Sequence, residues 1–304
     1  MRIGTVIMKG VVRALGALPL GFHYACARFC SWFLKKVIRY RRDVVMTNLA
    51  RSFPDRKYKE LKEISDKFYR HFGRIFAEAI WFGGCRNPER LRRKRIVEYS
   101  SLEVFEEAYR ESNGIMVLLG HFGNWEFMGG FANYDYREDA RMPEGMDPAD
   151  VVFVYKPLKS KMWDEIMLEN RTAPSRRQGY NSFVTSEKIL RFALQNRDRK
   201  LVLNFITDQS PYRNSTVETT VEFMHQKTRT MLGGVSIARK FGWSVLYSAI
   251  VPKEGGGYEW KFTRICRDAS KVTPEEIMQE YYRLLQADIE ACPWAYLWSH
   301  RRWK

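Results

Sequence analysis

A chain of 304 residues is long enough for one large domain or two small ones. Apolar residues make up 45% of it and aromatic residues 14%, which excludes a disordered, collagen-like or disulfide-scaffold protein. Lys and Arg outnumber Asp and Glu by 51 to 35, so the net charge is +16. A surplus of this size indicates an anionic partner: nucleic acid, a phosphorylated ligand or an anionic membrane.

The five cysteines give no sign of a covalent framework. They are odd in number and widely spaced, and the chain contains no C-x-x-C pair. Disulfide scaffolds and zinc sites both rely on paired or regularly spaced cysteines. We therefore expect reduced thiols facing the cytosol, with no metal site, at Cys26, Cys30, Cys85, Cys266 and Cys292.

The N-terminal segment differs from the rest of the chain. Residues 14–27 carry no charge, but this run is shorter than the ~20 apolar residues that a spanning helix needs, and Pro19 weakens it further. Residues 30–42 then mix Trp and Phe with Lys and Arg, which is typical of a segment lying in the interface of an anionic leaflet. We expect residues 1–42 to be a membrane-associated helical segment, peripheral or half-inserted rather than spanning. The alternative is an amphipathic helix packed on its own domain.

Beyond this segment the chain alternates between patterns typical of helices and of strands. Helical periodicity or capping signals predict helices at 57–82, 101–112, 160–171, 184–196 and 230–241, and a last helix that begins with the capping box at 273–276. Short apolar runs bounded by turn residues predict strands at 115–120, 151–155, 201–206, 244–251 and 258–265.

This alternation predicts an α/β fold, in which helices cross over between the strands of a sheet. No internal repeat and no linker divides the chain, and the charged stretch 137–150 is typical of a surface loop. We therefore expect the segment at 1–42 to precede a single catalytic domain at 43–304.

His121 is the strongest catalytic candidate because it directly follows the buried strand at 115–120. Ligands of α/β sheets bind at the carboxyl ends of strands. Gly120 and Gly123 would let the backbone turn sharply and leave room for a substrate. If the chain turns there, Glu126 can fold back toward the imidazole, fix its tautomer and leave the other ring nitrogen to take a proton. The sequence thus predicts a base, His121, oriented by Glu126.

A nucleophile from the protein itself is not apparent in the sequence. The chain has no G-x-S-x-G motif, and no cysteine stands next to a plausible partner. We therefore expect the nucleophile to be a hydroxyl group of the substrate, which attacks an activated acyl group. Metal ligation by His121 is the competing interpretation, but its spacing to Glu126 is not that of H-E-x-x-H.

Two further residues are candidates for binding substrate. Asp208 follows the strand at 201–206, so it is expected at the same edge of the sheet, where it could hold a substrate-binding arginine or a sugar hydroxyl. The alternative for Asp208 is a helix or turn cap. Arg171 is a candidate phosphate or glycolipid ligand because a guanidinium group suits bidentate contact. Gly123 and Asn124, beside His121, complete the predicted substrate-binding set.

The hexapeptide at 121–126, HFGNWE, resembles the histidine-x4-acid motif of the glycerolipid acyltransferase superfamily, in the form seen in the lipid A late acyltransferases. Further blocks similar to those of this family occur in order over most of the chain: Asn48–Leu49, Ser52–Pro54, Tyr155–Leu158, Arg171, Thr207–Gln209 and Tyr296–Lys304. In the last block, Arg301, Arg302 and Lys304 alternate with Trp298 and Trp303, which is typical of an interface facing phospholipid headgroups.

The resemblance implies a mixed sheet flanked by helices and an inner-membrane enzyme at the cytoplasmic face. Members of this family move a fatty acyl chain from acyl carrier protein, or sometimes coenzyme A, onto a hydroxyl group of an anionic lipid A precursor. His121 would be the general base and Glu126 its orienting acid. No cofactor is implied.

Other functions stay open at this point. The acceptor could be a lysophospholipid or an amino-acid lipid, because the choice of acceptor depends on loops around the site. A basic nucleic-acid-binding protein would explain the charge, but the sequence lacks the aromatic strand motif, recognition helix or zinc spacing of that class. A catalytically inactive lipid-binding relative is disfavoured because His121 and Glu126 are both present.

Overall fold

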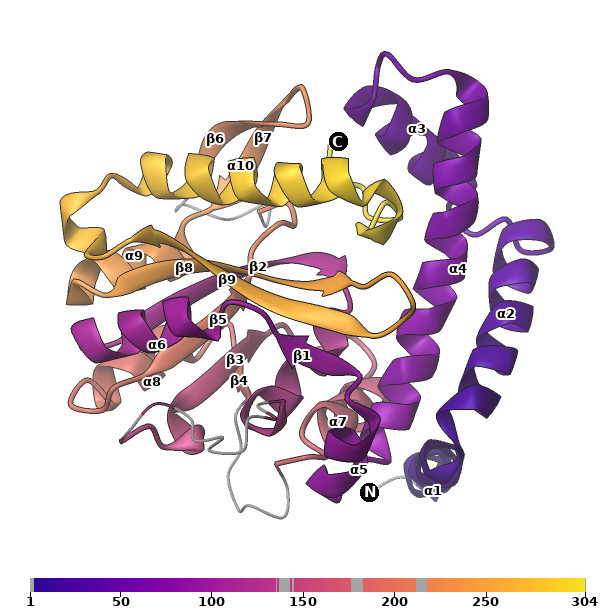
Figure 1. The fold of residues 1–304 in the computed structure, drawn as a ribbon, viewed down its shortest axis with the longest axis horizontal. Coiled ribbons are helices and arrows are strands. Elements are labelled where there is room, and N and C mark those ends of the chain that lie inside the picture. Colours follow the sequence, from indigo (N-terminus) through magenta and orange to yellow (C-terminus); the bar gives the residue numbers. More distant parts are fainter. Residues whose placement is uncertain are drawn as a thin grey trace.

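The computed structural model describes residues 3–134, 136, 143, 145–175, 183–211 and 218–303. Its centre is a seven-stranded mixed sheet of order β1-β9-β8-β2-β5-β3-β4 (Figure 1). β8 and β9 pair antiparallel, whereas the other neighbours pair parallel. The strands are β1 Val97–Tyr99, β2 Ile115–Gly123, β3 Val151–Tyr155, β4 Phe183–Thr185, β5 Val202–Ile206, β8 Ser244–Pro252 and β9 Tyr258–Cys266. A separate antiparallel hairpin consists of β6 Glu218–Phe223 and β7 Gln226–Met231.

Helices cover this sheet and extend beyond one end of it. The α-helices are α1 Ile3–Ala17, α2 Leu20–Lys36, α3 Arg42–Ser52, α4 Tyr58–Gly83, α5 Pro88–Lys94, α6 Leu102–Glu111, α7 Lys161–Arg171, α8 Ile189–Gln195, α9 Gly233–Phe241 and α10 Pro274–Ala291. Short 3-10 helices are η1 Trp125–Asn133, η2 Pro148–Asp150, η4 Ala269–Lys271 and η5 Pro293–Ala295. The predicted α/β fold with a mixed sheet flanked by helices is therefore confirmed.

The elements expected from periodicity are present with small shifts in their ends. β3 has the predicted bounds, and α4, α6 and α10 begin within one residue of their expected starts. The elements expected from the sequence do not include β1, β4 or the 3-10 helix η1, nor the pairing of β6 with β7. Much of the predicted loop at 137–150 lies outside the described residues.

The sheet buries apolar side chains on both faces, which explains the unbroken apolar runs in the sequence. Successive side chains of β2 enter opposite layers of the core. Met116 and Leu118 pack in the layer that α4, α9 and α10 cover. Val117 and Leu119 pack in the layer that α6 and η1 cover. β2 is consequently buried at the centre of the molecule, and only its carboxyl end approaches solvent.

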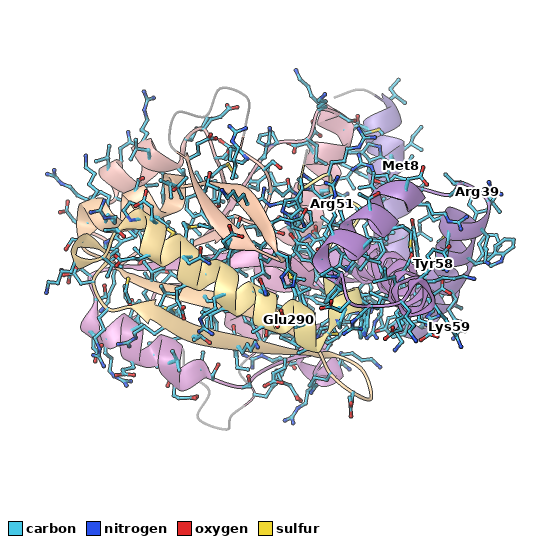
Figure 2. The ribbon with its side chains drawn as sticks, turned by 90° about the horizontal axis from the view of Figure 1, so that it is seen from above. Met8, Arg39, Arg51, Tyr58, Lys59 and Glu290 are labelled. Atoms are coloured by element: carbon cyan, nitrogen blue, oxygen red, sulfur yellow. The ribbon has the colours of Figure 1, made fainter. Side chains whose placement is uncertain are left out.

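The N-terminal helices form a layer at the side of the sheet. α4 runs beside the sheet, and α2 packs along the outer side of α4 (Figure 1). Figure 2 shows Met8, Arg39, Tyr58 and Lys59 on this helical side of the molecule. No single helix among the described residues is long and apolar enough to cross a membrane. α1 and α2 meet the same length and composition criteria only as a pair bent by 115°.

The C-terminal segment is built into the domain. Asn48 Nδ2 of α3 donates to the carbonyl oxygens of Trp298 and His300, each at 2.8 Å. Arg302 is 4% exposed, and its guanidinium donates to the Tyr282 hydroxyl and to a backbone carbonyl. Trp298 is fully buried. The expectation that this ending faces phospholipid headgroups is therefore wrong for Trp298 and Arg302, which stabilise the interior instead.

Candidate active site

The segment that carries His121 leaves the regular ladder of the sheet. The pairing of β2 with β8 shifts in register between Leu119 and Gly123, so the intervening residues bulge at the strand's carboxyl end. Gly123 has φ +64°, and a Cβ there would lie 1.6 Å from the carbonyl oxygen of Ile250. Only glycine fits this close approach. The bulge lifts His121 from a buried strand into a partly exposed position.

Alternate carbonyl groups of this bulge are held by different parts of the chain. The Tyr281 hydroxyl of α10 donates to the oxygen of Leu119 at 2.8 Å. The backbone N–H of Leu297 donates to the oxygen of His121 at 3.0 Å. His71 of α4 donates from Nε2 to the oxygen of Gly123 at 2.9 Å. Three separate elements therefore fix the backbone on either side of the imidazole.

The imidazole of His121 is hydrogen-bonded to Asp208. Nδ1 of His121 lies 2.7 Å from Oδ1 of Asp208, which is buried. Asp208 follows β5, which is the parallel neighbour of β2, so the carboxyl ends of the two strands bring both side chains to one place. Burial alone would raise the pKa of Asp208, but the charge and the hydrogen bonds of His121 lower it below its ordinary value. Asp208 is therefore ionised at neutral pH.

Glu126 has a different partner. Arg171, at the end of α7, donates to the two oxygens of the Glu126 carboxylate from Nε and Nη2, each at 2.7 Å. This is a bidentate ion pair with Glu126 buried and Arg171 partly exposed. Burial raises the pKa of Glu126, but Arg171, the Trp125 N–H and His121 more than offset this and lower it.

The direct contact between Glu126 and His121 expected from the sequence is thus taken by Asp208. His121 and Glu126 are instead connected through Trp125, which contacts both of them. Its ring packs edge-on against the imidazole, with centroids 4.9 Å apart, and its indole N–H donates to Glu126 at 3.1 Å. The site therefore holds two buried carboxylates, one bonded to the imidazole and one to Arg171.

Asn124 is fully buried and connects the site to the helical layer. Its side-chain oxygen accepts from the backbone N–H of Glu126 at 3.1 Å, which caps η1. Its Nδ2 donates to Glu78 of α4 at 2.7 Å. Glu78 has no exposed surface and also accepts, at 2.6–2.7 Å, from Tyr24 of α2, Arg74 of α4 and Tyr258 of β9. These internal bonds occupy the Asn124 side chain, and its predicted contact with substrate stays a prediction.

The hydrogen bond to Asp208 decides which nitrogen of His121 is basic. If Nδ1–H donates to the carboxylate, the lone pair of the neutral ring lies on Nε2. Nε2 faces the Gln209 side-chain amide at 3.3 Å. A hydroxyl group that takes the place of this amide would lie where Nε2 can remove its proton. The arrangement can thus serve as a general base for an alcohol.

Sequence reasoning missed several residues of the site. Gln209 belongs to the block Thr207–Gln209, which resembles a block of the family, but nothing in the sequence indicated that it contacts the imidazole of His121. Glu78 and His71 lie on the apolar face of a helix, a position that signalled core packing only. Trp125 was read as part of the motif without a role. The helical period of α4 was visible, but not which strand end it would face.

One comparison with known proteins identifies the chain. A family model described as bacterial lipid A biosynthesis acyltransferase matches residues 1–304, the whole chain. A comparison with curated proteins gives no significant match. Because the family match covers the complete α/β fold and every residue of the site described above, the chain belongs to the bacterial lipid A biosynthesis acyltransferase family, and is an enzyme that transfers acyl groups.

Proposed function

We propose that this enzyme moves a fatty acyl chain from a thioester donor, acyl carrier protein or coenzyme A, onto a hydroxyl group of a lipid A precursor. Membership of the family supports the acyl transfer and the lipid A acceptor. The 2.7 Å contact of His121 Nδ1 with Asp208 carries the mechanism, since it leaves Nε2 to accept a proton.

In the proposed reaction, His121 Nε2 takes the proton of the acceptor hydroxyl as its oxygen attacks the thioester carbonyl. The tetrahedral intermediate then collapses, the carbon–sulfur bond breaks, and the proton passes from the imidazolium to the leaving thiolate. Asp208 holds the ring in the required tautomer and stabilises its charged form. The products are the acyl ester and the free thiol.

Glu126 and Arg171 act beside this pair. We assign Glu126 to positioning: through Trp125 and its own charge it supports the imidazole, in place of the direct bond expected from the sequence. Two N–H groups of Arg171 are committed to Glu126. A guanidinium has five N–H groups, so the remaining ones can meet an anionic substrate, as the sequence predicted.

We propose that the enzyme works on the cytoplasmic face of the inner membrane, attached through α1 and α2. These helices expose many apolar side chains, among them Ile3, Phe29 and Trp32, each more than half exposed. Basic residues Lys35 and Lys36 form the last turn of α2. An exposed apolar surface with basic residues at its rim suits attachment to an anionic leaflet.

Acyl transfer by the purified enzyme tests the function. The full-length protein in detergent is given acyl carrier protein and coenzyme A thioesters, each with a lipid A precursor, a lysophospholipid or an amino-acid lipid. We expect transfer to the lipid A precursor, and a fall in rate of about 10²- to 10⁴-fold for Glu126→Ala. Transfer only to a lysophospholipid or an amino-acid lipid would refute the proposed acceptor. Failure with every acceptor would refute the function.

A further inference from the structure

A cavity lies between α4 and η5, outside the site that holds His121. It has a volume of about 340 Å³ and is lined by Lys67, Arg70, His71, Arg74 and Trp294. This is room for a phosphate group with part of a glycerol or sugar attached. We refer to it as the α4 cavity.

The charge of the α4 cavity has one sign. Lys67, Arg70 and Arg74 are spaced so that they share one face of α4, and no carboxylate is among the lining residues. Arg74 is bonded to Glu78 from its Nε atom. Within the part of the chain that the structure describes, neither Lys67 nor Arg70 forms an ion pair. The ammonium group of Lys67 and the guanidinium group of Arg70 can therefore contact an anion in the cavity.

Neighbouring elements add to this positive field. Lys35 of α2 forms an ion pair with Asp66 of α4. Burial, followed by the charges of Lys36, Arg70, Lys62 and Arg42, nevertheless lowers the pKa of Lys35 to about 8. Arg70 therefore repels Lys35, and an anion bound at Arg70 would relieve this repulsion.

His71 and Trp294 form the floor of the α4 cavity, and His71 also contacts the active site. The rings of His71 and Trp294 pack edge to face, with centroids 5.1 Å apart. His71 is buried, and it donates to the carbonyl oxygen of Gly123, two residues after His121. A single hydrogen bond thus separates the cavity floor from the catalytic bulge, so a ligand here lies within the span of one lipid molecule from His121.

The surroundings favour a lipid over a free metabolite. Arg74 lies over the ring of Tyr24, which comes from α2, the helix that exposes Phe29 and Trp32. A helix with an exposed apolar surface next to a cationic cavity matches a molecule with an acyl chain and an anionic headgroup.

From these observations we propose that the α4 cavity binds the phosphate group of an anionic lipid headgroup. Lys67 and Arg70 contact the phosphate, Arg74 adds its charge, and Trp294 packs against the headgroup's sugar or glycerol. This proposal rests on the proposed function in one point only. The proposed acceptor is itself an anionic lipid, which favours a lipid as the source of the phosphate.

A binding experiment tests this site without acyl transfer. The full-length protein in detergent is titrated with dihexanoyl phosphatidylglycerol, dihexanoyl phosphatidylcholine and inorganic phosphate. The variant K67Q/R70Q removes two charges at the cavity. The control R197Q/K271Q removes two charges from exposed side chains of other elements. We expect phosphatidylglycerol to bind most tightly, and its affinity to fall about tenfold in K67Q/R70Q and not in the control.

Each other result has a definite meaning. Equal affinity in K67Q/R70Q and wild type would overturn the site, as would equal losses in both double variants. Inorganic phosphate binding as tightly as phosphatidylglycerol, with the same loss in K67Q/R70Q, would overturn the lipid source. For a phosphorylated acceptor, K67Q/R70Q should raise KM about tenfold with little change in kcat. If the wild-type enzyme transfers no acyl chain, the proposed function fails while the titration still decides the site.

Discussion

At the scale of single residues, the choice of carboxylate partner for His121 matters most. Asp208 accepts from Nδ1 and so selects the tautomer whose Nε2 is basic. Asp208→Asn would keep the shape but replace the charged acceptor with an amide, which can favour the other tautomer. We expect kcat to fall about 10²- to 10⁴-fold with little change in KM. Steady-state kinetics measure this, with circular dichroism to show that the variant is folded. Activity within twofold of wild type would mean that Asp208 does not orient the base.

A second prediction at this scale concerns pH. Burial lowers the pKa of His71 to about 4, from an ordinary value of 6.5, although its bond to Gly123 opposes this. The unfolded chain therefore binds a proton at His71 between pH 6.5 and pH 4 that the folded chain does not. The free energy of unfolding should therefore fall by about 1.4 kcal/mol per pH unit as the pH drops through this window. Above pH 6.5 His71 should make no pH-dependent contribution to it.

His71→Gln keeps a side chain that can donate to Gly123 but removes the titration. The difference in unfolding free energy between pH 7 and pH 5 should therefore be smaller in His71→Gln than in wild type. Denaturant unfolding at the two pH values measures it. An unchanged difference would show that His71 does not titrate in this range. His300, whose pKa burial also lowers to about 4, contributes in the same direction in both proteins.

At the scale of elements, Glu78 joins parts of the chain that are far apart in sequence. It accepts hydrogen bonds from α2, α4, β9 and Asn124, which caps η1. Glu78→Gln would replace one oxygen of the carboxylate, which accepts hydrogen bonds, with an NH₂ group, which donates them. This NH₂ group would face N–H or O–H groups that also donate. We expect a loss of about 2–3 kcal/mol in unfolding free energy and a lower kcat, because the cap of η1 is loosened. The matched control is Glu63→Gln, at an exposed position of the same helix. Equal stability of the two variants would contradict this role.

The same scale shows what sequence could predict. The apolar runs of β2, β3 and β5 located these strands because parallel strands are buried on both faces. β4 has three residues, too few for a periodic signal. The pairing of β6 with β7 was not predicted, because these strands are largely polar, as in Glu218–Phe223.

The sequence predicted where the residues of the site lie, but not which of them are hydrogen-bonded to one another. His121 and Asp208 follow the strands predicted at 115–120 and 201–206, so their place at the edge of the sheet follows from the pattern. Their mutual contact depends on β2 and β5 being neighbours, which the sequence does not state. The pairing of Glu126 with Arg171 likewise depends on how α7 packs against η1. Local spacing within HFGNWE suggested Glu126 for His121, and tertiary packing placed Asp208 there instead.

At the scale of the whole molecule, the helical layer of α1 and α2 lies at one side of the sheet, whereas α8 lies on another (Figure 1). Phe29→Ser with Trp32→Ser removes two exposed apolar side chains from α2. We expect binding to anionic phospholipid vesicles to fall at least about tenfold, because this apolar surface enters the interface. The control is Leu190→Ser with Leu194→Ser, which removes two exposed apolar side chains from α8. Vesicle co-sedimentation of the full chain measures both, and equal binding of the two variants would contradict attachment through α2.

The most direct test of the whole account is the rate of acyl transfer by His121→Ala in a single turnover. The enzyme is in excess of the acyl donor, and the acceptor is at a saturating concentration. The account predicts that this variant binds vesicles and substrates as wild type does and forms almost no ester, because it lacks the imidazole that is proposed to remove the proton. Ester formation at a rate close to that of wild type would show that the imidazole is not the base.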